Sequence, residues 1–283
     1  TNNSSEGSLW GAVVGAYRST GSGYDPVKIT NSTFTQNDAI AIRFAQNATI
    51  TGNTITYNRQ GIAVGGGATT ITDNVITHNQ GAPSTACGIW VRNGSVVTIS
   101  GNQIMDNGGS GCGSGLHIQG GGGVAATISG NTIVRNTGRG ISGGWGGSLS
   151  ITNNYIADNS GGGIEADGAI VRYNRIHNNN RTSNGSALSI ESGTYEYNTI
   201  TGGTGTSLIF KGQGNPTIRN NNFVHKSETY LIYDDAGGSN TFDFENNWWG
   251  TTDTTNLDAL IYDWNDNSTK ELVDYTPFLT APD

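Results

Sequence analysis

"ITGNTITYN" at residues 50–58 is followed by "ITDNVITHN" at 71–79, "ISGNQIMDN" at 99–107, "ISGNTIVRN" at 128–136 and "ITNNYIADN" at 151–159. Each copy begins with Ile and carries Asn at its fourth and ninth positions. The heads of successive copies lie 20 to 29 residues apart. A period of this length, built from short β-branched segments, predicts a solenoid in which copies stack on one another.

The same slots continue beyond these copies. The heads are Ile29, Ile50, Ile71, Ile99, Ile128, Ile151, Val171, Tyr195, Ile218 and Phe244. The residues three after a head, from the second copy onward, are Asn53, Asn74, Asn102, Asn131, Asn154, Asn174, Asn198, Asn221 and Asn247. The residues eight after a head are Asn37, Asn58, Asn79, Asn107, Asn136, Asn159 and Asn179.

Within each copy, alternation at period two is present and helical periodicity is absent, which predicts three short strands and three bends per coil. Stacking places residues of the same slot about 4.8 Å apart. Asn tolerates left-handed backbone, binds turn amides and can bond its copies along the stack. We therefore assign the Asn slots to structure.

The pattern resembles the right-handed parallel β-helix proteins of the pectate-lyase-like superfamily over roughly residues 29–250. The tail, "NNWWGTTD", "IYDWNDN" and "VDYTPFL", is similar to the segment that closes such solenoids. The resemblance implies an all-β, single-stranded right-handed parallel β-helix of about ten coils. It also implies one domain, with an N-terminal segment and first coil at 1–28, repeats at 29–250 and a cap at 251–283. The catalytic motifs of polygalacturonases, pectate lyases and alginate epimerases are not found, so no catalytic residue is carried over.

The composition argues against a nucleic-acid partner and against a membrane span. Only 13% of residues are charged and the net charge is −8, which argues against a nucleic-acid partner because phosphate binding needs clustered Lys and Arg. No run of 18 apolar residues is present to span a membrane. We expect a monomer or a part of a longer multidomain protein.

The two cysteines fall in the inserted loops of neighbouring copies. Stacked coils bring such loops within the reach of a disulfide, so we predict a bond between Cys87 and Cys112. Two buried free thiols are the alternative. A disulfide would indicate an oxidising setting, and hence a secreted, extracellular protein.

Function on a solenoid lies with outward side chains that break the repeat. In strands such as "GIWV", "GLHI" and "GIEA", the apolar ends point inward and the middle residue outward. Following this slot and the one two residues later predicts one outward stripe, made of Trp90, Arg92, His117, Gln119, Trp145, Glu165, Asp167, Glu191, Lys211 and Asp234. Aromatic rings beside carboxylates suit a sugar polymer, whereas a solvated face with scattered ion pairs is the alternative.

Three functions fit this stripe. A polysaccharide hydrolase, which we favour slightly, would use Glu165, Asp167 and Glu191 as its acid and its base or nucleophile. A lyase would bind Ca²⁺ with the same acids and use Lys211 or Arg92 as the base. Trp90, Arg92, His117, Gln119, Trp145 and Asp234 would bind the polysaccharide or oligosaccharide. The third function is a non-catalytic carbohydrate-binding or surface module. No cofactor is predicted apart from Ca²⁺ in the lyase.

Two further outward columns are assigned mainly to structure. The first lies seven after each head and contains Tyr57, His78, Asp106, Arg135, Asp158 and His225, whose alternating signs favour cross-strand pairing. The second contains Arg172, Glu196, Arg219 and Glu245, the pattern of a salt-bridge ladder.

Overall fold

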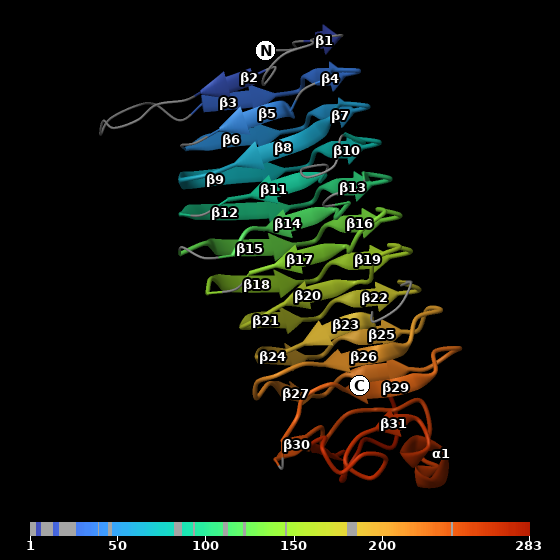
Figure 1. Cartoon of the computed structure of the whole chain (residues 1–283). Coiled ribbons are helices and arrows are strands. Elements are labelled where there is room, and N and C mark those ends of the chain that lie inside the picture. The colour runs from blue at the N-terminus through green and yellow to red at the C-terminus, as the bar shows by residue number, and fades with distance from the viewer. Residues whose placement is uncertain are drawn as a thin grey trace.

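The computed structural model describes residues 4–6, 14–16, 27–38, 40–44, 47–81, 87–92, 94–109, 113–120, 123–144, 146–179, 186–238 and 240–283, with only the backbone described at 4–6, 14–16 and 44. The described chain winds through three parallel sheets that run the length of the molecule (Figure 1). The predicted all-β parallel solenoid with three strands per coil is therefore confirmed.

Sheet A has ten strands, which are β1 (Ser4–Glu6), β4 (Thr33–Thr35), β7 (Thr54–Thr56), β10 (Val75–Thr77), β13 (Gln103–Met105), β16 (Thr132–Val134), β19 (Tyr155–Ala157), β22 (Arg175–His177), β25 (Thr199–Thr201) and β28 (Asn222–Val224). Sheet B has eleven strands, which are β2 (Val14–Ala16), β5 (Ile40–Phe44), β8 (Gln60–Val64), β11 (Ile89–Val91), β14 (Leu116–Ile118), β17 (Ile141–Gly143), β20 (Ile164–Ala166), β23 (Ser186–Ile190), β26 (Ser207–Lys211), β29 (Tyr230–Asp234) and β31 (Ile261–Tyr262). Sheet C has nine strands, which are β3 (Val27–Thr30), β6 (Ala48–Thr51), β9 (Gly67–Thr72), β12 (Ser95–Ser100), β15 (Ala125–Ser129), β18 (Ser148–Thr152), β21 (Ala169–Arg172), β24 (Gly193–Glu196) and β27 (Thr217–Arg219).

The number of strands in sheet C gives the number of turns of the solenoid. About eight full turns separate its first strand from its last, slightly fewer than the predicted ten coils. Partial turns at both ends, such as β1 and β2 before it and β31 after it, account for the difference.

The repeat heads form one column of the core. Ile50, Ile71, Ile99, Ile128 and Ile151 pair in register along sheet C, and each is fully buried. The apolar residues of sheets A and B form two more buried columns that face them. Period-two alternation explains this division, because every second side chain of each short strand points inward.

Buried Asn side chains bond the coils together where the chain turns. At the corner between sheets C and A, Asn102 Nδ2 donates to Asn131 Oδ1 at 3.0 Å. At the corner between sheets A and B, Asn107 Nδ2 donates to Asn136 Oδ1 at 3.1 Å, and the same Oδ1 accepts the Asn107 amide. These stacks are called the C–A ladder and the A–B ladder, and they confirm the structural assignment of the Asn slots.

The C-terminal end of the core is closed by aromatic side chains. Trp249 is 2% exposed and its ring lies 4.9 Å from that of Phe223 and 6.1 Å from that of Phe244. Beyond it come the short helix α1 (Thr254–Asp258) and the two-stranded pair of β30 (Thr241–Asp243) and β32 (Leu272–Asp274), at the bottom of Figure 1. Such a cover protects the open edges of the last coil. No helix in the described part of the chain is long and apolar enough to cross a membrane.

Candidate functional site

The outer face of sheet B carries one continuous column of half-buried side chains. Strand register pairs Trp90 with His117, His117 with Ser142, Ser142 with Glu165, and Glu165 with Ser189. Period-two alternation turns each of them away from the apolar core. The structure thus places Trp90, His117 and Glu165 on one face, as the sequence predicts.

Hydrogen bonds organise the centre of this column. Ser142 Oγ lies 3.0 Å from His117 Nδ1 and 3.0 Å from Ser114 Oγ. Burial lowers the pKa of His117, and the charge of Glu165 opposes this only in part. The imidazole is therefore held in its neutral form, as a hydrogen-bonding group and not a cation.

Glu165 is paired with an arginine from the preceding coil. Its Oε2 lies 2.5 Å from Nη1 of Arg139, and both side chains are about a quarter exposed. Arg139 precedes β17, so two neighbouring coils supply the two partners. The pair neutralises one of the three acids expected in the stripe.

Asp167 and Glu191 follow directly on β20 and β23. Asp167 Oδ1 accepts a hydrogen bond from the Ser192 hydroxyl. Burial raises the pKa of Glu191, and the charges of Asp167 and Glu165 raise it further, against a lowering effect of Lys211. The structure therefore brings the three acids close enough to interact, and this environment favours the protonated form of Glu191.

Trp90 and Arg92 lie at the N-terminal end of the column. The Arg92 guanidinium lies 5.0 Å from the centre of the Trp90 ring, a cation–π contact. Trp90 Nε1 is buried and has no hydrogen-bond partner among the described residues. Gln119 follows β14 and is half-buried, while Trp145 lies outside the described residues.

Lys211 and Asp234 do not face the stripe, so their predicted outward orientation is wrong. Lys211 pairs in register with Ile190 and Asp234, and both Lys211 and Asp234 are fully buried. Lys211 Nζ lies 3.4 Å from Glu271 Oε2 and 3.3 Å from the centre of the Phe242 ring. The physical reason is the two-residue period of a strand: a one-residue error in alignment reverses every side chain.

The correct outward residues of these strands are aromatic and were missed. Phe210 pairs with Ser189, Tyr233 with Phe210, and Tyr262 with Tyr233. The Tyr233 and Tyr262 rings stack at 4.9 Å, with Tyr230 tilted against both. Both "SALSI" and "SLIFK" begin with Ser, and aligning Ser186 with Ser207 would have predicted that Phe210 points outward.

The other predictions for this part of the chain have mixed outcomes. Cys87 is buried and is not a free thiol, but Cys112 lies outside the described residues, so their bond stays a prediction. The salt-bridge ladder is present, since Glu196 binds Arg172 at 2.7 Å and Arg219 at 2.7 Å.

A calcium site is not assembled by the predicted donors. The described residues contain no group of three or more His, Cys, Asp or Glu side chains that could hold a metal ion. Of the three predicted donors, Glu165 is bound by Arg139, whereas Asp167 accepts one hydrogen bond from Ser192.

Comparison with known proteins gives the class. The family model "Right handed beta helix region" matches residues 15–123 and 87–248. The chain therefore belongs to the right-handed β-helix family, which also confirms the handedness expected from the resemblance. No curated protein and no solved structure matches the chain. The family defines the scaffold, and a scaffold of this kind does not by itself specify an activity.

Proposed function

We propose that this is a secreted polysaccharide-active enzyme that hydrolyses glycosidic bonds on the outer face of sheet B. One observation carries the proposal: Glu165, Asp167 and Glu191 lie together on or directly after two neighbouring strands of sheet B, where burial and the two other charges raise the pKa of Glu191. Glycoside hydrolysis uses two carboxyl groups, and a raised pKa suits the one that acts as the acid. Secretion is inferred from the predicted disulfide alone.

The roles follow from what each acid contacts. Glu191 keeps its proton and donates it to the glycosidic oxygen as the bond to the anomeric carbon breaks. Asp167, oriented by Ser192, is the second carboxylate, which activates water or attacks the anomeric carbon itself. Glu165 is bound to Arg139, so we assign that pair, together with His117, to holding sugar hydroxyls.

Aromatic side chains flank these acids along the solenoid. Trp90 lies on the N-terminal side and Phe210 and Tyr233 lie on the C-terminal side, in the same column of sheet B. Rings of this kind cover the apolar faces and edges of sugars while polar groups hold the hydroxyls. An extended polysaccharide lying parallel to the solenoid axis would contact both groups and pass over Glu191.

The lyase alternative has less support. Lys211, its preferred base, is buried and bound to Glu271, so its ammonium does not reach the outer face of sheet B. Arg92 remains, but its guanidinium lies over Trp90 and an arginine side chain gives up its proton very poorly.

The test is a panel of neutral and acidic polysaccharides, with two measurements made on each. Hydrolysis releases reducing ends without the absorbance of an unsaturated uronide. Glu191→Gln and Asp167→Asn should each lower turnover at least about a hundredfold, the scale of losing one acid–base group. Asp243→Asn, which changes an exposed acid of β30, is the matched control and should keep wild-type turnover.

Each other result contradicts hydrolysis in a specific way. Reducing ends together with uronide absorbance would indicate a lyase. Binding of a polysaccharide without either signal would indicate a non-catalytic module. Wild-type turnover in Glu191→Gln would remove this residue from the chemistry.

A further inference from the structure

A hollow of about 480 Å³ lies away from the outer face of sheet B, at the corner between sheets A and B in the first coils. Its lining side chains include Gln36, Asp38, Tyr57, Arg59, His78 and Gln80. These residues come from three successive coils and follow the ends of β4, β7 and β10. The proposed cleavage uses none of them.

The backbone at this corner is costly for the side chains that it carries. Among the described residues, seven successive coils place a left-handed residue there: Gln36, Tyr57, His78, Asp106, Arg135, Asp158 and Asn178, with φ between 49° and 57°. Residues other than Gly, Asn, Asp and His adopt this conformation rarely.

The corner between sheets C and A provides a comparison within the same molecule. Its left-handed positions are Asn31, Gly52, Asp73, Gly101, Gly130, Asn153, Tyr173, Tyr197, Asn220 and Asn246. Only two of these ten, both Tyr, are unsuited to the conformation, against three of seven at the other corner, which are Gln36, Tyr57 and Arg135. Two of those three, Gln36 and Tyr57, line the hollow, so it is lined by side chains at positions where Gly or Asn would be less strained.

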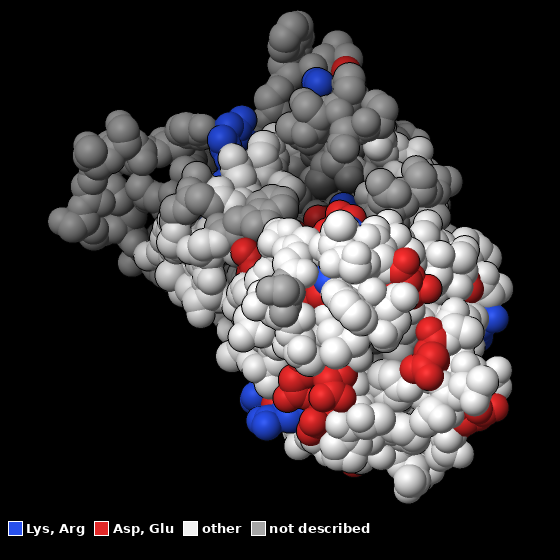
Figure 2. All heavy atoms as spheres, turned by 60° about the horizontal axis from the view of Figure 1, so that its bottom comes forward, with Lys and Arg blue, Asp and Glu red and all other residues white. Residues whose placement is uncertain are grey.

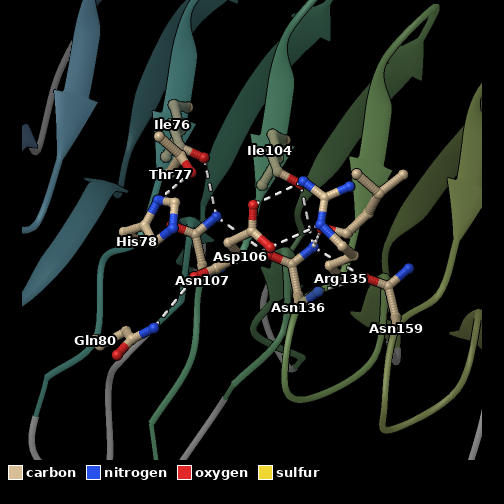
Figure 3. Close-up of polar contacts among 11 residues, drawn as sticks. Ile76, Thr77, His78, Gln80, Ile104, Asp106, Asn107, Arg135, Asn136 and Asn159 are labelled. Carbon is tan, nitrogen blue, oxygen red and sulfur yellow. Dashed lines mark hydrogen bonds and ion pairs between the residues drawn. The ribbon is translucent and has the colours of Figure 1, made fainter.

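Tyr57 and His78 form an aromatic wall for the hollow. Their rings stack at 4.9 Å and 28°, and Tyr57 is 57% exposed. His78 Nδ1 lies 2.8 Å from the Thr77 hydroxyl, which fixes the imidazole at the corner (Figure 3). The next two coils at this corner hold Asp106 and Arg135 in a two-fold hydrogen bond of 2.8 Å, so those charges are occupied.

Arg59 brings a cation to the hollow. No ion pair joins it to Asp38 or to any other acid in the described part of the chain. In this it resembles Arg92 and Arg175, whose guanidinium groups lie over aromatic rings, and differs from Arg135, Arg139, Arg172 and Arg219, each of which binds a carboxylate. A guanidinium without a partner beside an exposed ring is suited to a ligand that has both a carboxylate and an apolar face.

We infer that the hollow binds one acidic sugar unit, a hexuronate. Tyr57 covers the apolar face of the pyranose ring and Arg59 binds its carboxylate. Gln36, Gln80 and Asp38 bind hydroxyls, and the charge of Asp38 confines the carboxylate of the sugar to the Arg59 side. This site is separate from the cleavage stripe and stands whether or not the stripe hydrolyses a bond.

The test is a titration monitored by NMR, with D-glucuronate and D-glucose as probes. The two sugars share a ring and differ in one carboxylate, and neither has a glycosidic bond to cleave. D-Glucuronate should bind the wild-type protein saturably and more tightly than D-glucose. Arg59→Gln should weaken D-glucuronate at least about tenfold and remove the preference for it, whereas Tyr57→Ala should weaken both sugars.

Tyr173→Ala is a closely matched control. Tyr173 has the same φ of 57° and the same exposure of 57%, and it stacks on Tyr197 as Tyr57 does on His78. Its removal should leave both affinities unchanged. No saturable binding of D-glucuronate, or equal affinities in wild type, Arg59→Gln and Tyr57→Ala, would overturn the inference. Because binding is measured without cleavage, failure here leaves the proposed hydrolysis intact, and failure of hydrolysis leaves the hollow intact.

Discussion

The carboxamide of Asn136 shows how single residues hold this fold together. It accepts two hydrogen bonds from Asn107, and its Nδ2 donates to Ile104 O at 3.1 Å and to Asn159 Oδ1 at 2.9 Å. The residue is fully buried, so no water replaces these partners when the side chain is lost. An Asn in this slot therefore satisfies two backbone groups of the preceding coil and also bonds the Asn side chains of the coils on either side.

Asn136→Ala should lower the free energy of unfolding by at least about 3 kcal/mol, because several buried polar groups lose their partners together. Denaturant unfolding measures this. Thr98→Ala, on the outer face of β12, is the control and should cost at most about 1 kcal/mol. Equal losses in the two variants would show that the ladder contributes nothing specific.

Glu191 should make stability depend on pH in a defined direction. Its pKa in the folded state is raised above the ordinary value of 4.5, so the folded protein binds the proton more tightly than the unfolded chain. This favourable contribution is present below that ordinary value and is lost as pH rises through the folded-state pKa. Glu191→Gln should therefore raise the melting temperature at neutral pH and not in acid. A melting temperature lowered at neutral pH would contradict the assigned environment.

At the scale of strands, the sequence predicts the inward columns well and the outward stripe only in part. Ile, Val and Asn slots recur because every coil buries the same positions, so the repeat itself carries the information. Strands β26 and β29 break the pattern with apolar residues on both faces, and the alignment by Ile209 and Ile232 is one residue out. Arg139 was missed as the partner of Glu165 because it lies outside any strand slot.

Strands β26 and β29, whose predicted alignment was one residue out, carry buried charged residues. These residues form a cluster that joins the two strands to the C-terminal segment. Glu271 is 4% exposed, its amide donates to Asp234 Oδ2 at 3.0 Å, and its Oε2 lies near Lys211 Nζ. Lys211 thus places a cation near two buried carboxyl groups. Burial lowers the pKa of Lys211 and raises that of Asp234, which reflects the cost of placing these groups inside.

Lys211→Met should lower the free energy of unfolding by about 3–5 kcal/mol at neutral pH, since it leaves buried carboxylates without a cation. The loss should shrink in acid, where Asp234, with its raised pKa, takes up a proton in the folded state. Urea unfolding at both pH values measures it. The exposed Lys226→Met is the control, with an expected change within about 0.5 kcal/mol. A loss that grows in acid would contradict this account.

For the whole molecule, charge is distributed unevenly along the solenoid. Residues 228–283 contain twelve acidic residues and one base, Lys270, a net charge of −11, whereas the rest of the chain carries +3. Figure 2, which brings the C-terminal end forward, shows acidic side chains in several groups over that surface. Like charges gathered at one end repel one another and oppose the compact state.

Added salt should therefore stabilise the protein. Raising the ionic strength from about 0.01 M to about 0.15 M shortens the screening length from about 30 Å to about 8 Å. We expect the free energy of unfolding to increase by about 1 kcal/mol, which corresponds to a melting temperature higher by about 2–4 °C for a chain of this size. Glu245→Gln, in the acidic end, should reduce this response, and Asp73→Asn, in the solenoid, should not. A melting temperature that falls with salt would show that ion pairs outweigh the repulsion.

Because every coil contacts its neighbours through the same ladders, distances along the solenoid can change only in whole coils. The hollow occupies the first coils and Glu191 lies several coils further on, so the interval between them is a whole number of steps of about 4.8 Å. Duplicating one complete coil, such as residues 71–98, would lengthen that interval by one step and keep every strand in register. The length of oligosaccharide that spans both sites would then increase in the same step, so substrate size would be set by counting repeats.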